Sequence, residues 1–282
     1  MLNIQDEISP LTDLCVCKGT AVPQFQGYRN DHPEFDVFPM QPWDREKLLD
    51  QQEAFYSTMR KYGVRLHFVP HSDAHPWAMY TRDTGFVIGD TLYYSRTREL
   101  PERNGEIALV RSILPDVKAV EIQGQIEGGD VLIDDGLAWV GLGTRTTPDA
   151  AAELGRHVEV IPLYLGPKVM HLDTRMTILP GRHLLTVPGV FQPDDLRLLN
   201  DRFTVIEVTE QEARAMGTNV FVINPETVVV HAGFERIASA VEAHGLTVER
   251  IDWSEPNALL GSFRCATMPL ARAGNAGRAA KS

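Results

Sequence analysis

A strand–turn–strand pattern recurs along this chain at intervals of about 45 residues. Four such patterns occupy residues 86–94, 131–140, 176–187 and 220–230, with turns centred near positions 90, 135, 181 and 225. A fixed period of this length is typical of folds in which one supersecondary unit is repeated and each unit covers its neighbour. The repeat therefore favours an assembly of similar units over a single open sheet.

Each hairpin is followed by a helical pattern and then by a short apolar strand. Residues 101–114 begin with proline and acidic side chains, as helix N-termini do. Comparable helical patterns cover residues 147–157, 192–200 and 233–244, and the strands after the four helices are predicted at 117–122, 158–163, 203–208 and 246–251. The unit is thus β-β-α-β, four times over.

The two ends of the chain supply the parts of a fifth unit. Residues 44–62 form an amphipathic helical pattern, residues 65–70 the strand after it, and residues 14–20 a hairpin with the strand that follows Cys265. Units repeated around a circle cover one another's edges. We therefore predict a five-unit α/β propeller in one domain, residues 1–272, with a flexible C-terminal tail, residues 273–282. The alternative is an open α/β sheet of two halves.

Composition excludes several classes of partner. A net charge of −11 and a pI of about 5.3 disfavour nucleic acid, because an acidic surface repels phosphate. No apolar run approaches the roughly 18 residues of a membrane span, and the N-terminus shows no signal-peptide pattern. Three cysteines are too few for a disulfide framework and suit a reducing compartment. We expect a cytoplasmic protein with no membrane or nucleic-acid partner.

Polar motifs occupy one place in the repeat, directly ahead of the first hairpin strand. Asp83, Glu127 and His171 follow one another at intervals of 44 residues, and Asp173 and Cys265 hold related positions. Equivalent points of a propeller converge on its axis, so we expect one shared site. A cysteine thiolate is a strong nucleophile, an imidazole transfers protons, and carboxylates pair with a planar guanidinium. This set suits attack by the thiolate on a guanidino carbon.

Five motifs in matching order resemble those of the guanidino-group-modifying, or pentein, superfamily. They are Thr81-Arg82-Asp83, Glu127-Gly128-Gly129-Asp130, Gly143-Thr144-Arg145-Thr146, His171-Leu172-Asp173-Thr174 and Arg264-Cys265-Ala266-Thr267-Met268-Pro269. The superfamily includes arginine deiminases, dimethylarginine dimethylaminohydrolases and arginine:glycine amidinotransferases. The resemblance covers residues 44–272 and implies the pentein fold, a small guanidino substrate, and no metal or organic cofactor.

The resemblance also implies a role for each matching catalytic residue. Cys265 would be the nucleophile and form a covalent amidino-thioether. His171 would protonate the departing amine and then activate water, and Glu127 would orient His171 and help to bind the guanidinium. Asp83 and Asp173 would bind guanidinium nitrogens.

Arginines would bind the other end of the substrate. Arg145 resembles the arginine that binds the substrate's carboxylate. Arg103 is the candidate for a second such arginine, with Arg96 and Arg98 as alternatives. Trp77 departs from the family pattern, because hydrolases of this group often carry Asp or Asn at its position, and it leaves the exact substrate open.

We therefore predict a hydrolase that acts on the guanidino group of arginine or a methylated or other arginine derivative. An amidinotransferase is the first alternative, since it forms the same covalent intermediate and passes the amidino group to an amine. Asp173 favours deiminase or transferase chemistry, because dimethylarginine hydrolases tend to have a non-acidic residue there. The second alternative is a non-catalytic binding protein of the same propeller fold. The sequence leaves the oligomeric state open.

Overall fold

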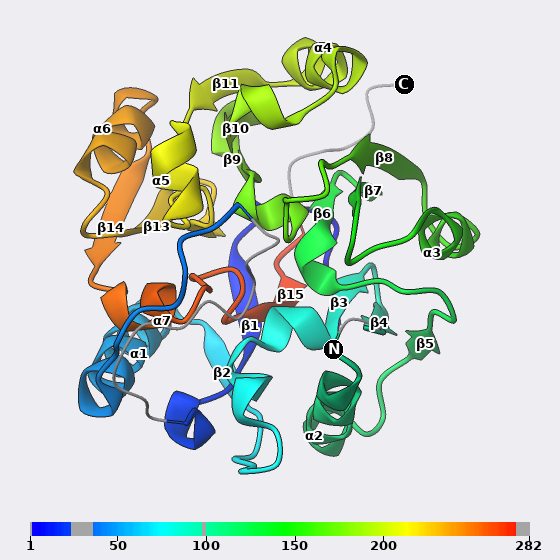
Figure 1. The fold of residues 1–282 in the computed structure, drawn as a ribbon, viewed down its shortest axis with the longest axis vertical. Coiled ribbons are helices and arrows are strands. Elements are labelled where there is room, and N and C mark those ends of the chain that lie inside the picture. The colour runs from blue at the N-terminus through cyan, green and yellow to red at the C-terminus, as the bar shows by residue number, and fades with distance from the viewer. Residues whose placement is uncertain (1, 24–35, 98–99, 275–282) are drawn as a thin grey trace.

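Five three-stranded sheets surround a central axis in the computed structural model, which describes residues 2–23, 36–97 and 100–274 (Figure 1). In each sheet two strands pair antiparallel, as a hairpin in four of the five sheets, and a third strand pairs in parallel with one of them. The sheets are β3 (Gly85–Ile88), β4 (Thr91–Tyr94) and β5 (Ala119–Glu121); β6 (Val131–Asp134), β7 (Leu137–Leu142) and β8 (Val160–Tyr164); β9 (Met176–Leu179), β10 (His183–Thr186) and β11 (Thr204–Glu207); β12 (Phe221–Asn224), β13 (Thr227–His231) and β14 (Thr247–Ile251); and β15 (Met268–Arg272), β1 (Leu11–Val16) and β2 (Arg65–Phe68). The predicted five-unit α/β propeller, the pentein fold, is confirmed.

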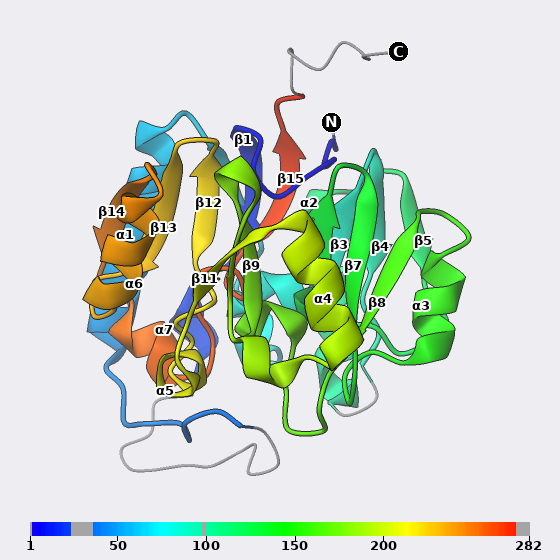
Figure 2. The same ribbon diagram turned by 90° about the horizontal axis from the view of Figure 1, so that it is seen from above.

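One helix of each unit lies on the outside of the ring, between its second and third strands (Figure 1). These helices are α1 (Arg45–Lys61), α2 (Glu106–Ile113), α3 (Pro148–Leu154), α4 (Pro193–Arg202) and α6 (Glu235–Ala243). Two short helices, α5 (Glu210–Arg214) and α7 (Ser254–Ala258), lie at one face of the ring, below the sheets in Figure 2. Every helix in the described part of the chain is too short or too polar to cross a lipid bilayer.

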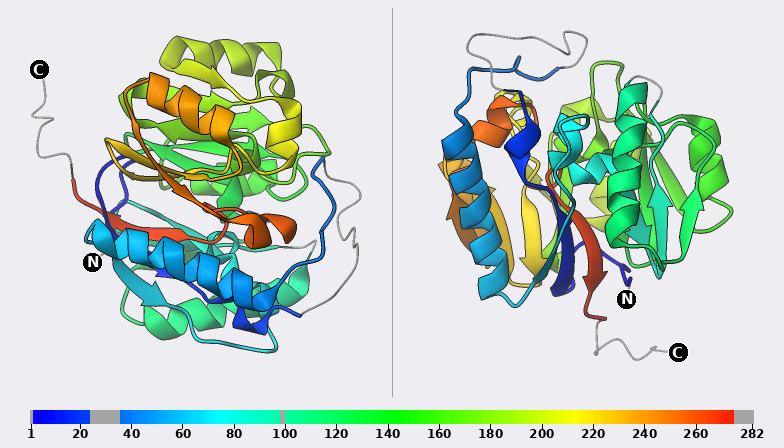
Figure 3. Two further views of the ribbon diagram at one scale, coloured as in Figure 1. Left: turned by 90° about the vertical axis from the view of Figure 1, so that its left-hand side faces the viewer. Right: turned by 90° about the horizontal axis from the view of Figure 1, so that it is seen from below.

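The split fifth unit closes the ring as predicted. β1 pairs antiparallel with β15, with Leu14 opposite Pro269, and parallel with β2, with Leu14 also opposite Leu66. Figure 3 shows β15 beside β1, with α1 running along the outside. The N-terminal segment adds to this closure, since the backbone N–H of Asn3 donates to the carbonyl oxygen of Leu270 at 3.0 Å.

Strands near the axis are buried on both faces. Every residue of β3, β4 and β6 is buried, whereas β5 and β2 are partly exposed. Neighbouring sheets cover the first strands and the helices cover the outer ones. The near-continuous apolar sequences of the hairpins follow from this two-sided burial.

The helix predicted at 101–114 begins differently from the expectation. Its first part is a 3₁₀ turn, Pro101–Gly105, and the α-helix α2 starts only at Glu106. The side chain of Asn104 accepts from the backbone N–H of Thr97 at 3.1 Å and donates to its carbonyl oxygen at 2.9 Å. Such side-chain bonds to backbone compete with helical hydrogen bonding.

Helices α5 and α7 were not expected from the repeat. The sequence does carry a signal for α5: Thr209 and Glu212 form a capping box, in which each side chain bonds the other's backbone N–H. Helix α7 leads through Leu259 and Leu260 toward Cys265.

Candidate active site

Three 3₁₀ turns bring the polar motifs together at the axis. They are Thr81–Thr84, Gly128–Asp130 and Leu172–Thr174, and each lies just ahead of the first strand of a unit. The backbone N–H of Leu172 donates to Oδ1 of Asp130 at 2.9 Å, and that of Arg82 donates to the carbonyl oxygen of Cys265 at 3.1 Å. Equivalent positions of adjoining units are thus bonded to one another, which places their side chains around one point.

Two glycines after Glu127 allow this close approach. A Cβ atom on Gly128 would lie 2.2 Å from the carbonyl oxygen of Arg82, and one on Gly129 would lie 2.7 Å from the ring of His171. The first obstacle is backbone and cannot move aside. The Gly-Gly pair is therefore required by packing between turns.

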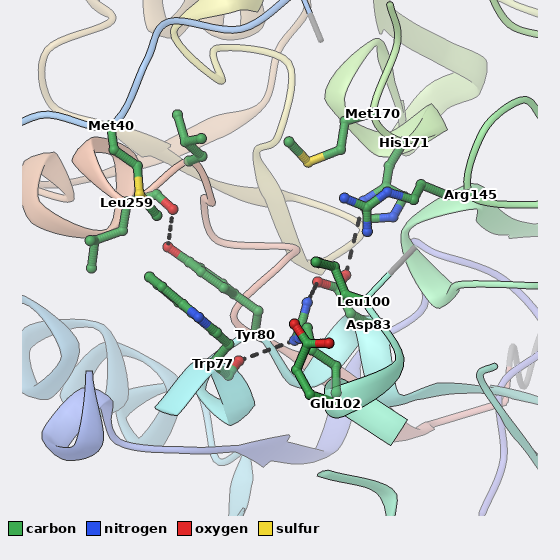
Figure 4. A pocket seen from close by; sticks show the side chains of 12 residues that line it. Met40, Trp77, Tyr80, Asp83, Leu100, Glu102, Arg145, Met170, His171 and Leu259 are labelled. Carbon is green, nitrogen blue, oxygen red and sulfur yellow. Dashed lines mark hydrogen bonds and ion pairs between the residues drawn. The ribbon is translucent and has the colours of Figure 1, made fainter. Parts of the chain in front are cut away.

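A cavity of about 360 Å³ opens beside these turns (Figure 4). Four of the predicted site residues line it, namely Asp83, Arg103, Arg145 and His171. The other lining residues are largely apolar: Met40, Trp77, Tyr80, Leu100, Glu102, Met170, Leu259 and Leu260. The cavity therefore has charged groups on one part of its wall and aromatic and aliphatic groups on another.

His171, Glu127 and Arg145 form a buried chain of charges. Nε2 of His171 lies 2.7 Å from Oε2 of Glu127, and Nη1 of Arg145 donates to both oxygens of Glu127 at 3.2 Å. Burial alone would lower the pKa of His171, but the bond to Glu127 and the charge of Asp83 raise that pKa to about 9. Burial also opposes ionisation of Glu127, yet the bond to His171 holds its pKa well below the ordinary value. The pair is thus imidazolium and carboxylate at neutral pH.

Arg103 is bonded to the protein's own carboxylates. Its Nη1 donates to Oδ2 of Asp83 at 2.7 Å, while Nε and Nη2 donate to Glu106. Nη2 also donates to the carbonyl oxygen of Trp77 at 3.1 Å. In this structure each guanidinium nitrogen of Arg103 has a partner within the protein, so its contacts are those of a residue that positions Asp83 and Trp77.

Asp173 is a buried carboxylate short of donors. Its side chain is 0% exposed, and neither carboxylate oxygen has a hydrogen-bond partner among the described residues. Its ion-pair partner is Arg264, whose Nε lies 3.6 Å from Oδ2, and Arg264 is itself bonded to Glu7. Burial raises the pKa of Asp173 in spite of the positive charge of Arg264. Oδ1 of Asp83 is likewise without a hydrogen-bond donor in the described part of the chain.

Cys265 is 6% exposed and is not among the residues that line the cavity. It belongs to the apolar cluster that contains Tyr80 and Met170, which do line the cavity. Oδ1 of Asn219 accepts from the backbone N–H groups of Arg264 at 2.9 Å and of Cys265 at 3.3 Å and so fixes the turn. Burial first, and then the charges of Asp173 and Asp83, raise the pKa of the thiol well above its ordinary value. The charge of Asp83 thus raises the pKa of both the Cys265 thiol and the His171 imidazole.

The remaining predicted residues lie apart from this cluster or outside the described residues. Arg96 is exposed, donates to the carbonyl and side-chain oxygens of Gln123, and borders a different groove. Arg98 lies outside the described residues. Trp77 lines the cavity and stacks on Tyr80, with ring centroids 6.5 Å apart and an interplanar angle of 6°.

Three predicted residues could also be considered as metal ligands. Asp83, Glu127 and His171 each offer one ligand atom, and these atoms lie within 4.8 Å of one another. Glu127, however, already accepts from Arg145 and His171. A metal ion at this point would have to displace the proton of His171 as well as these hydrogen bonds. The chemistry of the group favours a hydrogen-bonding organic cation.

Sequence reasoning missed three residues that shape the site. Glu7 is buried and bonded to Arg264, although it lies in an N-terminal stretch without a repeat pattern. Met40 lines the cavity from a segment outside the repeated units, and no sequence signal indicated it. Tyr80 directly precedes the Thr-Arg-Asp motif, and this position was the only feature of the sequence that could have indicated a place in the site.

Comparison with known proteins identifies the family of this chain. The family model for arginine deiminase matches residues 44–200. A relative from Bacillus subtilis, the uncharacterized protein YkgA, is 33% identical over 229 residues, covering 79% of this chain and 80% of the relative. The N(G),N(G)-dimethylarginine dimethylaminohydrolase of Pseudomonas aeruginosa is 25% identical over 242 residues, covering 80% of this chain and 89% of that protein.

Solved structures show the same fold. The N-terminal domain of ArgZ, an arginine dihydrolase from cyanobacteria solved with bound substrate, superposes with a TM-score of 0.80 at 19% identity, covering 92% of this chain and 98% of that one. SxtG, an amidinotransferase from Microseira wollei, superposes with a TM-score of 0.81 at 17% identity, covering 97% and 98%. At such low identity these likenesses concern the fold.

Proposed function

Because the chain belongs to the arginine deiminase family, we propose that it hydrolyses the guanidino group of arginine or an arginine derivative through a covalent bond to Cys265. The family and the relatives support a guanidino-modifying enzyme. The observation that carries the proposal is the set of buried carboxylate oxygens on Asp173 and Asp83 that accept no hydrogen bond from the described residues, together with a buried thiol whose pKa their charges raise. The proposal includes a cytoplasmic location, which the three free cysteines favour.

The carboxylates suit a guanidinium better than other ligands. Buried anions need a partner charge and hydrogen-bond donors. A guanidinium supplies five N–H donors in one plane and keeps its charge. In the proposed complex Asp173 and Oδ1 of Asp83 accept from different nitrogens, which directs the guanidino carbon toward Cys265.

The first proposed step exchanges one carbon–nitrogen bond for a carbon–sulfur bond. Binding of the guanidinium favours loss of the Cys265 proton to solvent, and the resulting thiolate attacks the guanidino carbon to form a tetrahedral adduct. The adduct collapses with cleavage of one C–N bond, and the departing amine takes a proton from His171. The pKa of about 9 keeps His171 protonated at neutral pH, as this step requires. An amidino-thioether cation remains on the sulfur.

The second proposed step restores the enzyme. His171, now neutral, removes a proton from water, and the hydroxide attacks the amidino carbon. Cleavage of the C–S bond returns the thiolate, and the ureido product forms as the proton of the adduct's hydroxyl passes to solvent. Glu127 holds the ring of His171 at 2.7 Å through both steps and stabilises its charged form.

Arg145 is the proposed ligand of the substrate's carboxylate, since it lines the cavity beside His171. The role of Arg103 as a second carboxylate ligand remains a prediction. Its contacts with Asp83 and Glu106 support a positioning role in the same site.

Amidino transfer is the second candidate, and the fold shared with SxtG favours it. Both reactions pass through the same intermediate. They differ in whether water or a second amine reaches the amidino carbon.

Product analysis tests the proposal. The protein is incubated with arginine, Nω-methylated arginines and agmatine, and all nitrogen products are measured by mass spectrometry. Hydrolysis gives a ureido compound with ammonia or methylamine, and transfer with an added amine gives a new guanidino compound. Cys265→Ser is expected to abolish turnover, whereas Cys17→Ala, which alters another buried thiol, retains it. Wild-type rates in Cys265→Ser would refute the covalent route, and a complete lack of turnover would favour a binding protein.

A further inference from the structure

The cavity has an apolar half whose residues the proposed reaction does not use. It consists of Met40, Trp77, Tyr80, Leu259 and Leu260. Figure 4 shows Met40, Leu259, Tyr80 and Trp77 on one side of the cavity and His171 and Arg145 on the other. Charged and apolar groups are therefore separated within one pocket.

The aromatic part of this half is held rigidly. The hydroxyl of Tyr80 donates to the carbonyl oxygens of Pro256 at 3.0 Å and Leu259 at 3.2 Å. Its ring packs so closely on Gly261 that a Cβ atom there would lie 2.1 Å from Cε1 of the ring. Trp77 stacks on Tyr80, and its carbonyl oxygen accepts from Arg103. The pair presents a fixed aromatic surface at the cavity.

The two arginines that line the cavity are bonded to the protein's own carboxylates. Arg103 is bonded to Asp83 and Glu106, and Arg145 is bonded to Glu127. Glu102 adds a further acid to the lining. Placing an amino-acid carboxylate against the apolar half would remove it from water without a partner, which is unfavourable. An apolar group would instead be stabilised by leaving water.

We propose that the apolar half binds an alkyl or aromatic group carried by the guanidino substrate, so that the preferred substrate is an apolar-substituted guanidine and not unsubstituted arginine. This inference rests on the proposed function, because it places the guanidinium at Asp83 and Asp173. Planar cations also stack favourably on aromatic faces, so the charged end is tolerated where it meets Tyr80. Trp77 is then a residue that determines specificity.

The apolar group has two possible points of attachment. It is either a substituent on a guanidino nitrogen, with the amino-acid chain running toward Arg145, or it is the substrate's own tail. Nω-propylarginine represents the first arrangement and butylguanidine the second.

Binding is measured by titration calorimetry on Cys265→Ser, which prevents turnover. Each buried methylene is worth about fourfold in affinity, so three buried carbons predict butylguanidine and benzylguanidine binding on the order of 50-fold tighter than guanidine. Either Nω-propylarginine or butylguanidine should bind more tightly than arginine. Arginine or guanidine binding as tightly as every substituted compound would overturn the inference.

Substitutions test which residues cause the preference for substituted guanidines. Trp77→Ala should weaken benzylguanidine on the order of tenfold and leave guanidine unchanged, and Trp77→Phe should retain most of the affinity. Tyr164→Ala removes an aromatic ring that is 55% exposed and remote from the cavity lining, so it is the matched control. Met40→Gln provides a second test from another segment. If Trp77→Ala weakened the binding of guanidine and of benzylguanidine equally, Trp77 would serve the fold and would not determine specificity. That result would contradict the inference.

These measurements distinguish a failure of this inference from a failure of the proposed function. A preference for substituted guanidines without turnover by the wild-type protein would remove the reaction and keep the binding site. Turnover of arginine with no preference would keep the reaction and remove this inference.

Discussion

Replacing Glu127 by glutamine removes one charge from the buried chain of His171, Glu127 and Arg145 while preserving its shape. In the wild-type protein the pKa of His171 is raised from 6.5 to about 9. The difference between these values corresponds to about 3 kcal/mol that favours the protonated, folded form. Burial by itself lowers the pKa of His171. We therefore expect Glu127→Gln to lower this pKa by at least about 2 units.

The loss of stability should depend on pH in a defined direction. Because the folded-state pKa of His171 is the higher one, its contribution is fully present below about pH 6.5 and is lost as pH rises through about 9. The free energy of unfolding should thus differ between wild type and Glu127→Gln by about 3 kcal/mol at pH 6, and by less at pH 10. Part of the loss of stability should not vary with pH, because the glutamine leaves Arg145 with an uncharged hydrogen-bond acceptor in place of a carboxylate.

Urea denaturation at pH 6, 8 and 10 measures this difference, and the NMR titration of the His171 ring measures the pKa directly. Glu226→Gln, an exposed carboxylate between β12 and β13, is the matched control and should change neither. A difference that stays constant across this pH range, or a His171 titration identical to wild type, would refute the assignment of the raised pKa to Glu127.

Three further changes test the packing around the site, each by urea denaturation. Glu7→Gln leaves the buried guanidinium of Arg264 without its closest carboxylate and should cost about 3 kcal/mol; a loss below about 1 kcal/mol would show that the pair is dispensable. Gly128→Ala places a Cβ atom 2.2 Å from a backbone oxygen and should cost at least about 2 kcal/mol, whereas Gly166→Ala, with nothing within 4 Å, should be near neutral. Equal effects of the two would contradict the close-approach argument. Thr209→Ala removes a capping box and should cost about 1 kcal/mol, and no change in stability would show that α5 does not need its cap.

The repeat made the architecture predictable from the sequence. The spacing of the turns predicted the number of units. The helix and strand near the N-terminus belonged to a unit that lacked part of its hairpin, and so predicted a partner strand after Cys265. That strand is β15. The 44-residue interval also brought Glu127 and His171 together correctly, at 2.7 Å. Local propensity and the length of the repeat were sufficient to predict the fold, because each unit repeats the same pattern of buried and exposed residues.

Other parts of the site depend on contacts that no period encodes. Arg103 was considered for the substrate's carboxylate, yet a 3₁₀ turn directs it to Asp83 and Glu106. Met40 and Glu7 come from segments outside the repeated units. Their positions follow from how those segments pack across the ring, which depends on distant side chains and not on local sequence.

The buried carboxylates connect substrate binding with formation of the nucleophile in the proposed reaction. Burial, Asp173 and Asp83 together hold the pKa of Cys265 well above its ordinary value, so the thiol is neutral while the site contains no added cation. A guanidinium between the two carboxylates would offset their charges and would itself favour the thiolate. Since the thiolate is the form that reacts with oxidants as well as with substrate, the same two carboxylates would, in the proposed reaction, account for selectivity toward a cation and for an unreactive thiol in its absence.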